Sequence, residues 1–201
     1  MAKITSIVAQ KKRGRVNIFV DGAYSFSVFE NSIIDFNLFK GKEISTEEIK
    51  KITSHDSQSK ALATAFRLLS FRPRSEKEIR NRLNLKYRSK ITEYVIKKLK
   101  KDKYLSDESF VDFWIENRVR SRGVSLLKSE LIKKGIAREI INEKILQIDE
   151  EDAYNNALKL IRLKTKYIKL EKREGIKKIS AYLTRRGFSY DIIKRVLREI
   201  Y

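Results

Sequence analysis

A short phrase closes two segments of this chain, as Leu-Ile-Lys-Lys-Gly-Ile at 131–136 and, 52 residues later, as Leu-Thr-Arg-Arg-Gly-Phe at 183–188. A leucine, a basic residue three positions on and then a glycine are typical of the end of an amphipathic helix. The leucine faces a core, the cation lies at the negative end of the helix dipole, and the glycine adopts the left-handed capping conformation. The recurrence therefore indicates an internal helical repeat.

A degenerate copy, Leu-Asn-Leu-Lys-Tyr at 83–87, lies 48 residues before Leu131 and has Tyr87 where the other copies have glycine. We expect this helix to end differently, by tightening its last turn. Apolar residues recur at spacings of three and four before and after each copy, which is the period of an amphipathic helix. The sequence thus predicts three units of three helices, at 57–106, 107–150 and 151–201.

Residues 1–56 have a different pattern, which predicts a small β-rich module. Val16–Val20 and Ala23–Val28 flank Asp21-Gly22, a strong signal for a hairpin with a type I′ turn, and this turn would place Phe19 opposite Tyr24. Ile4–Ala9 is a third expected strand, joined through the basic turn 10–15. We expect Tyr24, Phe26 and Val28 to share one face of this sheet.

Short helices are expected at 31–38 and 45–52, to cover that face of the sheet. Ser45 and Glu48 form a possible capping box, as do Ser75 and Glu78 at the start of a helix in the first repeat. The polar stretch Thr53–Ser57, which contains the single histidine, His55, is interpreted as a solvated linker between the module and the repeats.

Composition limits the class of protein. Hydrophobic residues make up 41% and charged residues 36% of the 201 positions, as in a folded, helix-rich protein, and the lack of cysteine excludes disulfides and thiolate metal sites. No run approaches the roughly 20 apolar residues that span a bilayer, and no targeting signal is evident, so we expect a cytoplasmic protein.

The net charge of +20 is unevenly distributed: +2 in residues 1–56, +11 in 57–106, −1 in 107–150 and +8 in 151–201. Such an excess favours a polyanionic partner, with nucleic acid first, because basic side chains release the counterions condensed on a phosphate backbone. The alternative is that lysine-rich helices only keep the surface soluble. An anionic membrane surface is a weaker alternative, since no basic helix face adjoins a broad aromatic one.

Catalytic patterns are nearly absent from the sequence. It has no cysteine nucleophile, no glycine-rich phosphate loop and no HExxH, and one histidine cannot form a triad or metal cluster alone. Asp107, Glu108, Asp112 and Glu116 could hold Mg²⁺ in a nuclease, but acidic residues in a first helical turn are already explained by the helix dipole. We therefore expect no enzyme activity, no metal and no cofactor.

Basic clusters are the richer signal, because arginine offers bidentate contacts to phosphate or carboxylate. The nearby aromatic residues Phe110, Phe113 and Trp114 have helical spacing, so we expect them in a core rather than stacked on bases. Arginines gather in three places along the chain: Arg72, Arg74, Arg80, Arg82 and Arg88; Arg118, Arg120 and Arg122; and Arg185 and Arg186.

Several of these segments together resemble the bacterial RecX regulatory family. The similarity runs through most of 57–201, and the module at 1–56 looks like an N-terminal extension that some members carry. The matching residues are Arg72-Pro73-Arg74-Ser75 with Glu78 and Leu83; Tyr104-Leu105-Ser106-Asp107 with Phe110, Trp114, Arg118, Arg122-Gly123, Glu130-Leu131 and Lys134-Gly135-Ile136; and Arg185-Arg186-Gly187-Phe188.

The resemblance implies a mainly α, elongated and curved protein of three tandem three-helix repeats that modulates the RecA recombinase without catalysis of its own, and we expect a monomer. Family members bind in the groove of the RecA filament on single-stranded DNA and restrain its growth, ATP hydrolysis, strand exchange and the SOS response. A nucleic-acid-binding module without a protein partner remains the alternative. The residues that we predict to contact the filament are Arg72, Arg74, Arg118, Arg122, Lys134, Arg185 and Arg186.

Overall fold

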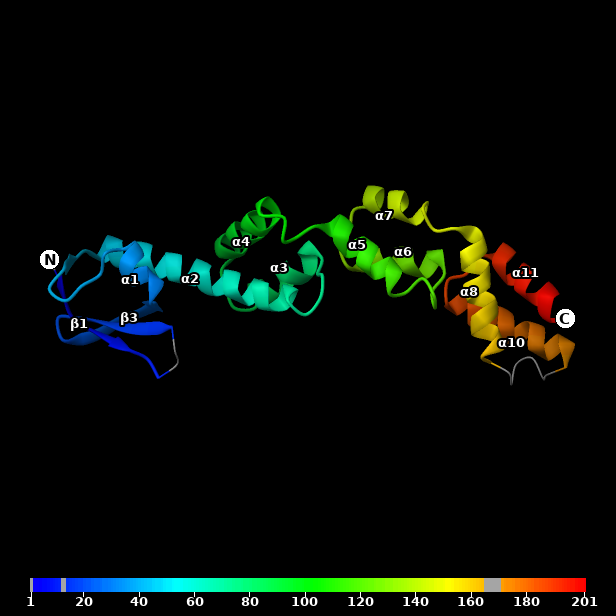
Figure 1. Cartoon of the computed structure of the whole chain (residues 1–201), viewed down its shortest axis with the longest axis horizontal. Coiled ribbons are helices and arrows are strands. Elements are labelled where there is room, and N and C mark those ends of the chain that lie inside the picture. Colours follow the sequence, from blue (N-terminus) through cyan, green and yellow to red (C-terminus); the bar gives the residue numbers. More distant parts are fainter. Residues whose placement is uncertain (1, 12–13, 165–170) are drawn as a thin grey trace. The chain divides into compact units, whose positions relative to one another are not determined.

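The computed structural model describes residues 2–11, 14–164 and 171–201, and these are mainly helical with a small sheet near the N-terminus (Figure 1). The strands are β1 (Ala2–Ala9), β2 (Arg15–Val20), β3 (Ala23–Phe29) and β4 (Glu43–Ile44). The helices are α1 (Asn31–Asp35), α2 (Thr46–Leu69), α3 (Glu76–Asn84), α4 (Ser89–Lys101), α5 (Asp107–Glu116), α6 (Val124–Lys133), α7 (Arg138–Ile145), α8 (Glu150–Arg162), α10 (Lys172–Arg185) and α11 (Tyr190–Ile200).

The Cα positions group into two compact units, Met1–Leu68 with Arg82–Lys98, and Leu69–Asn81 with Leu99–Tyr201. Both units contain helices of the repeats, and the first also contains the sheet. Among the described helices, none combines the length and the apolar character needed to cross a bilayer.

The sheet confirms the predicted hairpin. Asp21 and Gly22 have φ values of 50° and 84°, so both central residues of the turn have the positive φ that a type I′ turn requires. Phe19 lies opposite Tyr24, as expected. The antiparallel strands are ordered β3-β2-β1-β4, and β4 was missed because a strand of two residues has no alternation to detect. The expected basic turn at 10–15 lies partly outside the described residues.

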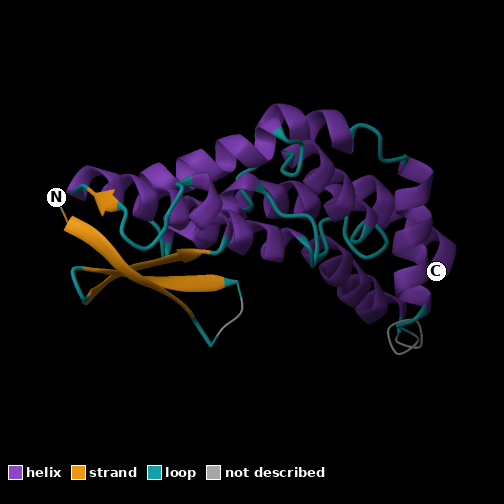
Figure 2. Ribbon diagram, turned by 60° about the vertical axis from the view of Figure 1, so that its left-hand side comes forward, coloured by secondary structure: helices purple, strands orange, loops and turns teal. Residues whose placement is uncertain are grey.

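The predicted inward position of Tyr24 is wrong. The register shifts between Ile18 and Phe19, so that Ser25 has no counterpart on β2, and this β-bulge breaks the alternation of faces. Phe26 and Val28 are buried as expected, whereas Tyr24 is 58% exposed. The buried face packs beside α2, which Figure 2 shows along one side of the sheet, and its core includes residues from β1 to α2: Ile4, Val16, Ile18, Phe26, Val28, Leu38, Ile44 and Ile52.

The predicted linker at Thr53–Ser57 is also wrong, because α2 runs without a break from Thr46 to Leu69. The capping box at its start is confirmed. The Ser45 N–H donates to Glu48 Oε2 at 2.9 Å, and the Glu48 N–H donates to Ser45 Oγ at 3.1 Å. The helix does not stop at Ile52 as expected, and His55 is half-buried within it, edge-on to Phe36.

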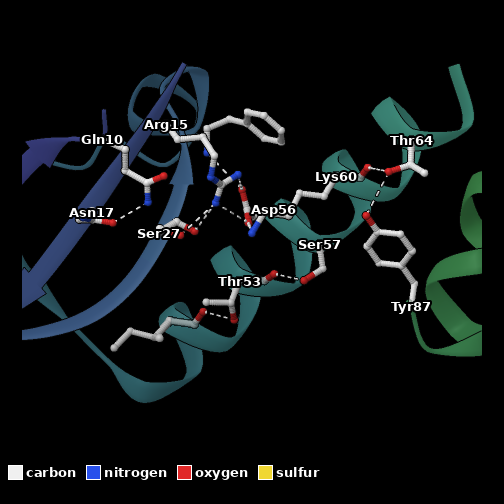
Figure 3. Close-up of polar contacts among 12 residues, drawn as sticks. Gln10, Arg15, Asn17, Ser27, Thr53, Asp56, Ser57, Lys60, Thr64 and Tyr87 are labelled. Carbon is white, nitrogen blue, oxygen red and sulfur yellow. Dashed lines mark hydrogen bonds and ion pairs between the residues drawn. The ribbon is translucent and has the colours of Figure 1, made fainter. Parts of the chain in front are cut away.

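A buried carboxylate explains the polar residues in the middle of α2. Asp56 is 2% exposed and accepts hydrogen bonds from both terminal nitrogens of Arg15, at 3.1 and 3.2 Å. It also accepts from the Phe29 N–H at 3.1 Å and pairs with Lys60 at 2.7 Å (Figure 3). Because removing one partner would leave a buried charge without compensation, this network ties α2 to the sheet.

The helices after the sheet confirm the predicted fold class, three units of three helices behind an N-terminal β module. Helices α5, α6 and α7 share one core, in which Phe110 and Trp114 are buried as expected, whereas Phe113 is only half-buried and lies outside it. Helices α8, α10 and α11 share another, built on residues such as Ile161, Ile179 and Leu183. The divisions of the chain at 56, 106 and 150 stay predictions.

The two glycine-ended phrases close their helices as predicted. Leu131 and Leu183 are fully buried, and Gly135 and Gly187 have φ values of 84° and 80°. The Ile136 and Phe188 N–H groups donate back to the carbonyls of Leu131 and Leu183, both at 3.2 Å, which is the Schellman pattern.

The degenerate copy ends α3 by tightening the last turn, also as predicted. The Lys86 and Tyr87 N–H groups both donate to the Leu83 carbonyl at 2.9 Å. Tyr87 is not among the residues with positive φ, so a side chain is tolerated at this position.

Candidate functional site

The glycine-ended phrases do more than end their helices, because each also packs on a helix of the preceding repeat; we name these contacts joints. At the first joint, the end of α6 meets the start of α3. The Ser75 hydroxyl, fully buried, donates to the Lys134 carbonyl at 2.8 Å and accepts from the Glu78 N–H at 3.2 Å. One side chain thus caps α3 and holds α6.

At the second joint, the end of α10 meets the start of α6. The Gly123 N–H donates to the Arg186 carbonyl at 2.8 Å, and the Ser125 N–H donates to the Gly187 carbonyl at 3.2 Å. The Arg186 guanidinium donates to the Ser121 carbonyl at 3.0 Å. Carbonyls at the negative end of α10 therefore satisfy N–H groups at the positive end of α6, a favourable alignment of helix dipoles.

The joints leave no room for a side chain at their glycines. A Cβ on Gly187 would overlap the backbone nitrogen of Leu126, and one on Gly123 would overlap the Gly187 carbonyl. A Cβ on Gly135 would lie 2.6 Å from Cδ of Lys77. Gly123 has a φ of −79°, which any residue adopts, so close contact alone requires glycine there.

Two carboxylates, those of Glu78 and Glu130, form ion pairs with four of the predicted contact residues. In the Glu78 cluster (Arg72, Glu78 and Lys134), Arg72 donates to both Glu78 oxygens at 3.0 Å, and Lys134 Nζ donates to Oε1 at 2.6 Å. Burial opposes ionisation of Glu78, but the hydrogen bonds from Arg72 and Lys134 outweigh it and lower the pKa of this carboxyl to about 2. Glu78 is therefore ionised throughout the physiological pH range.

The Glu130 cluster consists of Trp114, Arg118, Arg122 and Glu130. Trp114 Nε1 donates to Glu130 Oε2 at 3.0 Å, while Arg118 and Arg122 lie 3.6 and 3.5 Å from the carboxylate. The Arg118 guanidinium carbon lies 4.0 Å from the centroid of the Trp114 ring, within cation–π range. Lys134 Nζ lies 5.1 Å from the same ring, so it links the two clusters.

The structure thus brings together Arg72, Arg118, Arg122 and Lys134. Their side chains remain 30–35% exposed, and these four cations share two carboxylates, so the surface stays positive. Arg186 belongs to neither cluster; it lies at the second joint, where its carbonyl accepts from the Gly123 N–H, next to Arg122. Arg185 is exposed at the end of α10, and Arg74 is half-buried between α2 and α3.

Three of the four acidic residues considered for Mg²⁺ have structural partners instead, and the fourth, Glu116, is exposed. Asp107 accepts from the Glu76 N–H at 2.9 Å, and burial raises its pKa. Asp112 pairs with Lys144 at 2.8 Å, and the Ser106 hydroxyl donates to Glu108 at 2.7 Å and lowers the pKa of that carboxyl. Within the described ranges, no three His, Asp or Glu side chains are grouped so as to hold a metal ion.

Sequence reasoning missed how these parts connect. It assigned Glu78 to a capping box, yet the Glu78 carboxylate binds Arg72 and Lys134. It named Gly123 as part of the family resemblance, although the glycine is needed for contact with Gly187, 64 positions away. No local pattern carries the contact between Lys134 and Glu78, because the two residues are 56 positions apart and belong to different repeats.

The chain matches the sequence profiles of four successive domains of one family. The regulatory protein RecX N-terminal domain matches residues 2–45, and the first, second and third three-helix domains of RecX match 61–99, 106–145 and 150–197. The resemblance of the N-terminal module to an extension of this family is therefore confirmed.

Curated relatives agree along the whole chain. A protein of Clostridioides difficile (strain 630), named Regulatory protein RecX, is 35% identical over 100% of this chain and 96% of its own length. The protein of the same name from Clostridium acetobutylicum is 36% identical over 98% of this chain and 96% of its length.

Solved structures show the same similarity. The crystal structure of a regulatory protein RecX is 30% identical, with a TM-score of 0.75 over 98% of both chains. That of RecX from Lactobacillus salivarius is 25% identical, with a TM-score of 0.65 over 73% of this chain and 97% of the other. The family consists of regulatory proteins, which confirms the expectation that this protein is not an enzyme. The chain belongs to the RecX family of regulatory proteins.

Proposed function

We propose that this protein inhibits the RecA recombinase by binding the filament that RecA forms on single-stranded DNA. It would act in the cytoplasm, as a monomer, to limit recombination, DNA repair and the SOS response. The observation that carries this proposal is the match of all four RecX domains, in order, along the chain. The net charge of +20 supports it, because both a DNA strand and an acidic protein surface attract a basic partner.

We place the contact surface on the open sides of the Glu78 and Glu130 clusters, together with Arg74, Arg185 and Arg186. The two carboxylates hold four of the cations in fixed positions, which reduces the entropy lost when they bind a partner. Arg185 offers the cleanest test of the set, because it is exposed at a helix end.

The direct experiment adds the protein in substoichiometric amounts to RecA from the same organism, on single-stranded DNA with ATP. Phosphate release and filament length are followed together, and both should fall. If neither changes and no binding to RecA is detected, the proposed function is wrong.

A residue-level test compares Arg185→Glu with Lys194→Glu, a matched control at another exposed position of the same repeat. The first variant should weaken inhibition severalfold, and the second should not. Reversal of both Arg118 and Arg122 should weaken inhibition too. These changes put new carboxylates beside Glu130, so the unfolding midpoint must be measured in parallel.

A nucleic-acid-binding module without a protein partner is the second candidate, favoured by the +11 charge of residues 57–106. In that case affinity for bare DNA would fall steeply with salt, and RecA would not change it. Binding that persists at high salt only when RecA filaments are present would decide for the first candidate.

A further inference from the structure

Helix α4 (Figure 1) has one buried face and one exposed face, and the exposed face belongs to neither the Glu78 cluster nor the Glu130 cluster. Lys90, Tyr94 and Lys97 lie at positions i, i+4 and i+7, so they form one row along the helix, and all three are exposed. We name this row the α4 stripe. The residues that point the other way are buried: Thr92, Val95, Ile96 and Leu99.

The lysines of the α4 stripe differ from the cations of the Glu78 and Glu130 clusters in forming no ion pair with a described carboxylate, although the exposed Glu93 lies beside the row. Across the described residues, no carboxylate forms an ion pair with Lys90 or Lys97. The surrounding sequence is equally one-sided, because Glu93 is the only acidic residue between positions 82 and 98. The same span contains Arg82, Lys86, Arg88, Lys90, Lys97 and Lys98.

Tyr94 lies between the two lysines and is 45% exposed. A base can stack on such a ring only when the face of the base is free. The bases of a single strand have free faces, whereas those of a duplex are already stacked on their neighbours. Lysines spaced along a helix on both sides of the ring provide the charge for a phosphate backbone. An acidic protein surface would satisfy the lysines equally well but gives no role to the exposed ring.

We propose that the α4 stripe is a binding surface for single-stranded DNA, with Lys90 and Lys97 on phosphates and Tyr94 stacked on a base. This inference deepens the proposed function, and rests on it only in assigning the DNA to the strand within the RecA filament. Under this proposal, α4 contacts the DNA, and the Glu78 and Glu130 clusters contact the recombinase.

Fluorescence anisotropy of the full-length protein with an oligothymidylate, over a series of salt concentrations, tests the two lysines. Each phosphate contact on a single strand contributes about 0.7 to the slope of log affinity against log salt concentration. Lys90→Gln with Lys97→Gln should therefore reduce that slope by about 1.4. The matched control, Lys40→Gln with Lys50→Gln, removes two exposed lysines of the same unit and should change the slope less.

Tyr94 is tested separately. Tyr94→Ala should weaken binding to the oligothymidylate about tenfold and leave binding to a duplex of equal length unchanged, since one stacked base contributes about 1–3 kcal/mol. Tyr94→Trp keeps an aromatic face and should retain most of the affinity, and circular dichroism checks that both variants fold.

The α4 stripe is not the DNA surface if the lysine variant matches the control in affinity and slope. It is also excluded if the variant binds bare DNA normally and loses affinity for RecA without DNA, because the lysines would then contact protein. A wild-type protein that binds single strands through the α4 stripe but leaves RecA ATP hydrolysis unchanged would overturn the proposed function and keep this inference.

Discussion

Helices α6 and α10 end on glycine, whereas α3 ends on tyrosine, and the difference follows from what each end contacts. Gly135 and Gly187 pack on the preceding repeat, where no Cβ fits without displacing other atoms. Tyr87 closes a helix of the first repeat, and its hydroxyl lies 3.2 Å from Thr64 Oγ1 in α2 (Figure 3). Glycine is thus required where one repeat joins the next, and a side chain is used where a helix end packs within its own repeat.

The largest expected effect comes from closing the second joint with a side chain. Gly187→Ala combines the cost of a left-handed conformation with overlap on the Leu126 backbone, and we expect a loss of about 4 kcal/mol in unfolding free energy. Gly41 has a φ of 92°, and a Cβ there would meet no other atom within 4 Å, so Gly41→Ala should cost about 1–2 kcal/mol. Equal losses in urea unfolding would show that the contact is unimportant.

The next effect tests the leucine of the phrase. Leu131 is fully buried, so Leu131→Ala should lower the unfolding free energy by about 3 kcal/mol through lost burial and the cavity that remains. Its neighbour Ile132 is 48% exposed, and Ile132→Ala should cost no more than about 0.5 kcal/mol. A similar loss for both would contradict the assigned helix face.

Glu78 gives a pH-dependent effect. Its pKa is lowered from 4.5 to about 2 in the folded protein, so its ionised form stabilises the fold fully above pH 4.5. This stabilisation is lost as the pH falls from 4.5 towards 2. Glu78→Gln should cost about 1–2 kcal/mol at pH 7 and progressively less in acid. Urea unfolding at pH 7, 4 and 3 measures the difference, with exposed Glu116→Gln as control; a constant difference would contradict the ion pairing.

The smallest effect concerns the tyrosine end. Tyr87→Phe removes the hydroxyl that meets Thr64 and should cost about 1 kcal/mol. Thr64→Val removes the same bond and also the one from Thr64 Oγ1 to the Lys60 carbonyl, so the loss in the double variant should be smaller than the sum of the two single losses. Fully additive losses in this double-mutant cycle would mean that the hydrogen bond does not link α3 to α2.

Local patterns were sufficient for much of this fold. Asp21-Gly22 predicted the hairpin, Ser45 and Glu48 predicted the start of α2, and the repeated phrase predicted two helix ends, because turns and caps depend on neighbouring residues. The errors arose where residues distant in the sequence determine the local structure. The polarity of Thr53–Ser57 favours a linker, yet Asp56 is neutralised by Arg15, 41 positions away, and the helix continues.

The candidate site shows the same limit. The contact residues could be selected by residue type and motif. The sequence did not indicate, however, that Arg72 would form an ion pair with Glu78, or Arg118 with Glu130. The α4 stripe was also missed, because its lysines are ordinary in type. They become distinctive only in the structure, where the cations of the clusters form ion pairs with Glu78 and Glu130, and Lys90 and Lys97 form none with a described residue.

Amide hydrogen exchange at Gly123 and Ser125 tests most directly whether the glycine ends are joints. N–H groups in a first helical turn exchange quickly when only water satisfies them. Because these two donate to the Arg186 and Gly187 carbonyls, they should be protected nearly as strongly as the interior of α6, and Gly187→Ala should remove that protection. Exchange as fast as at Arg138, in the first turn of α7, would contradict the joint.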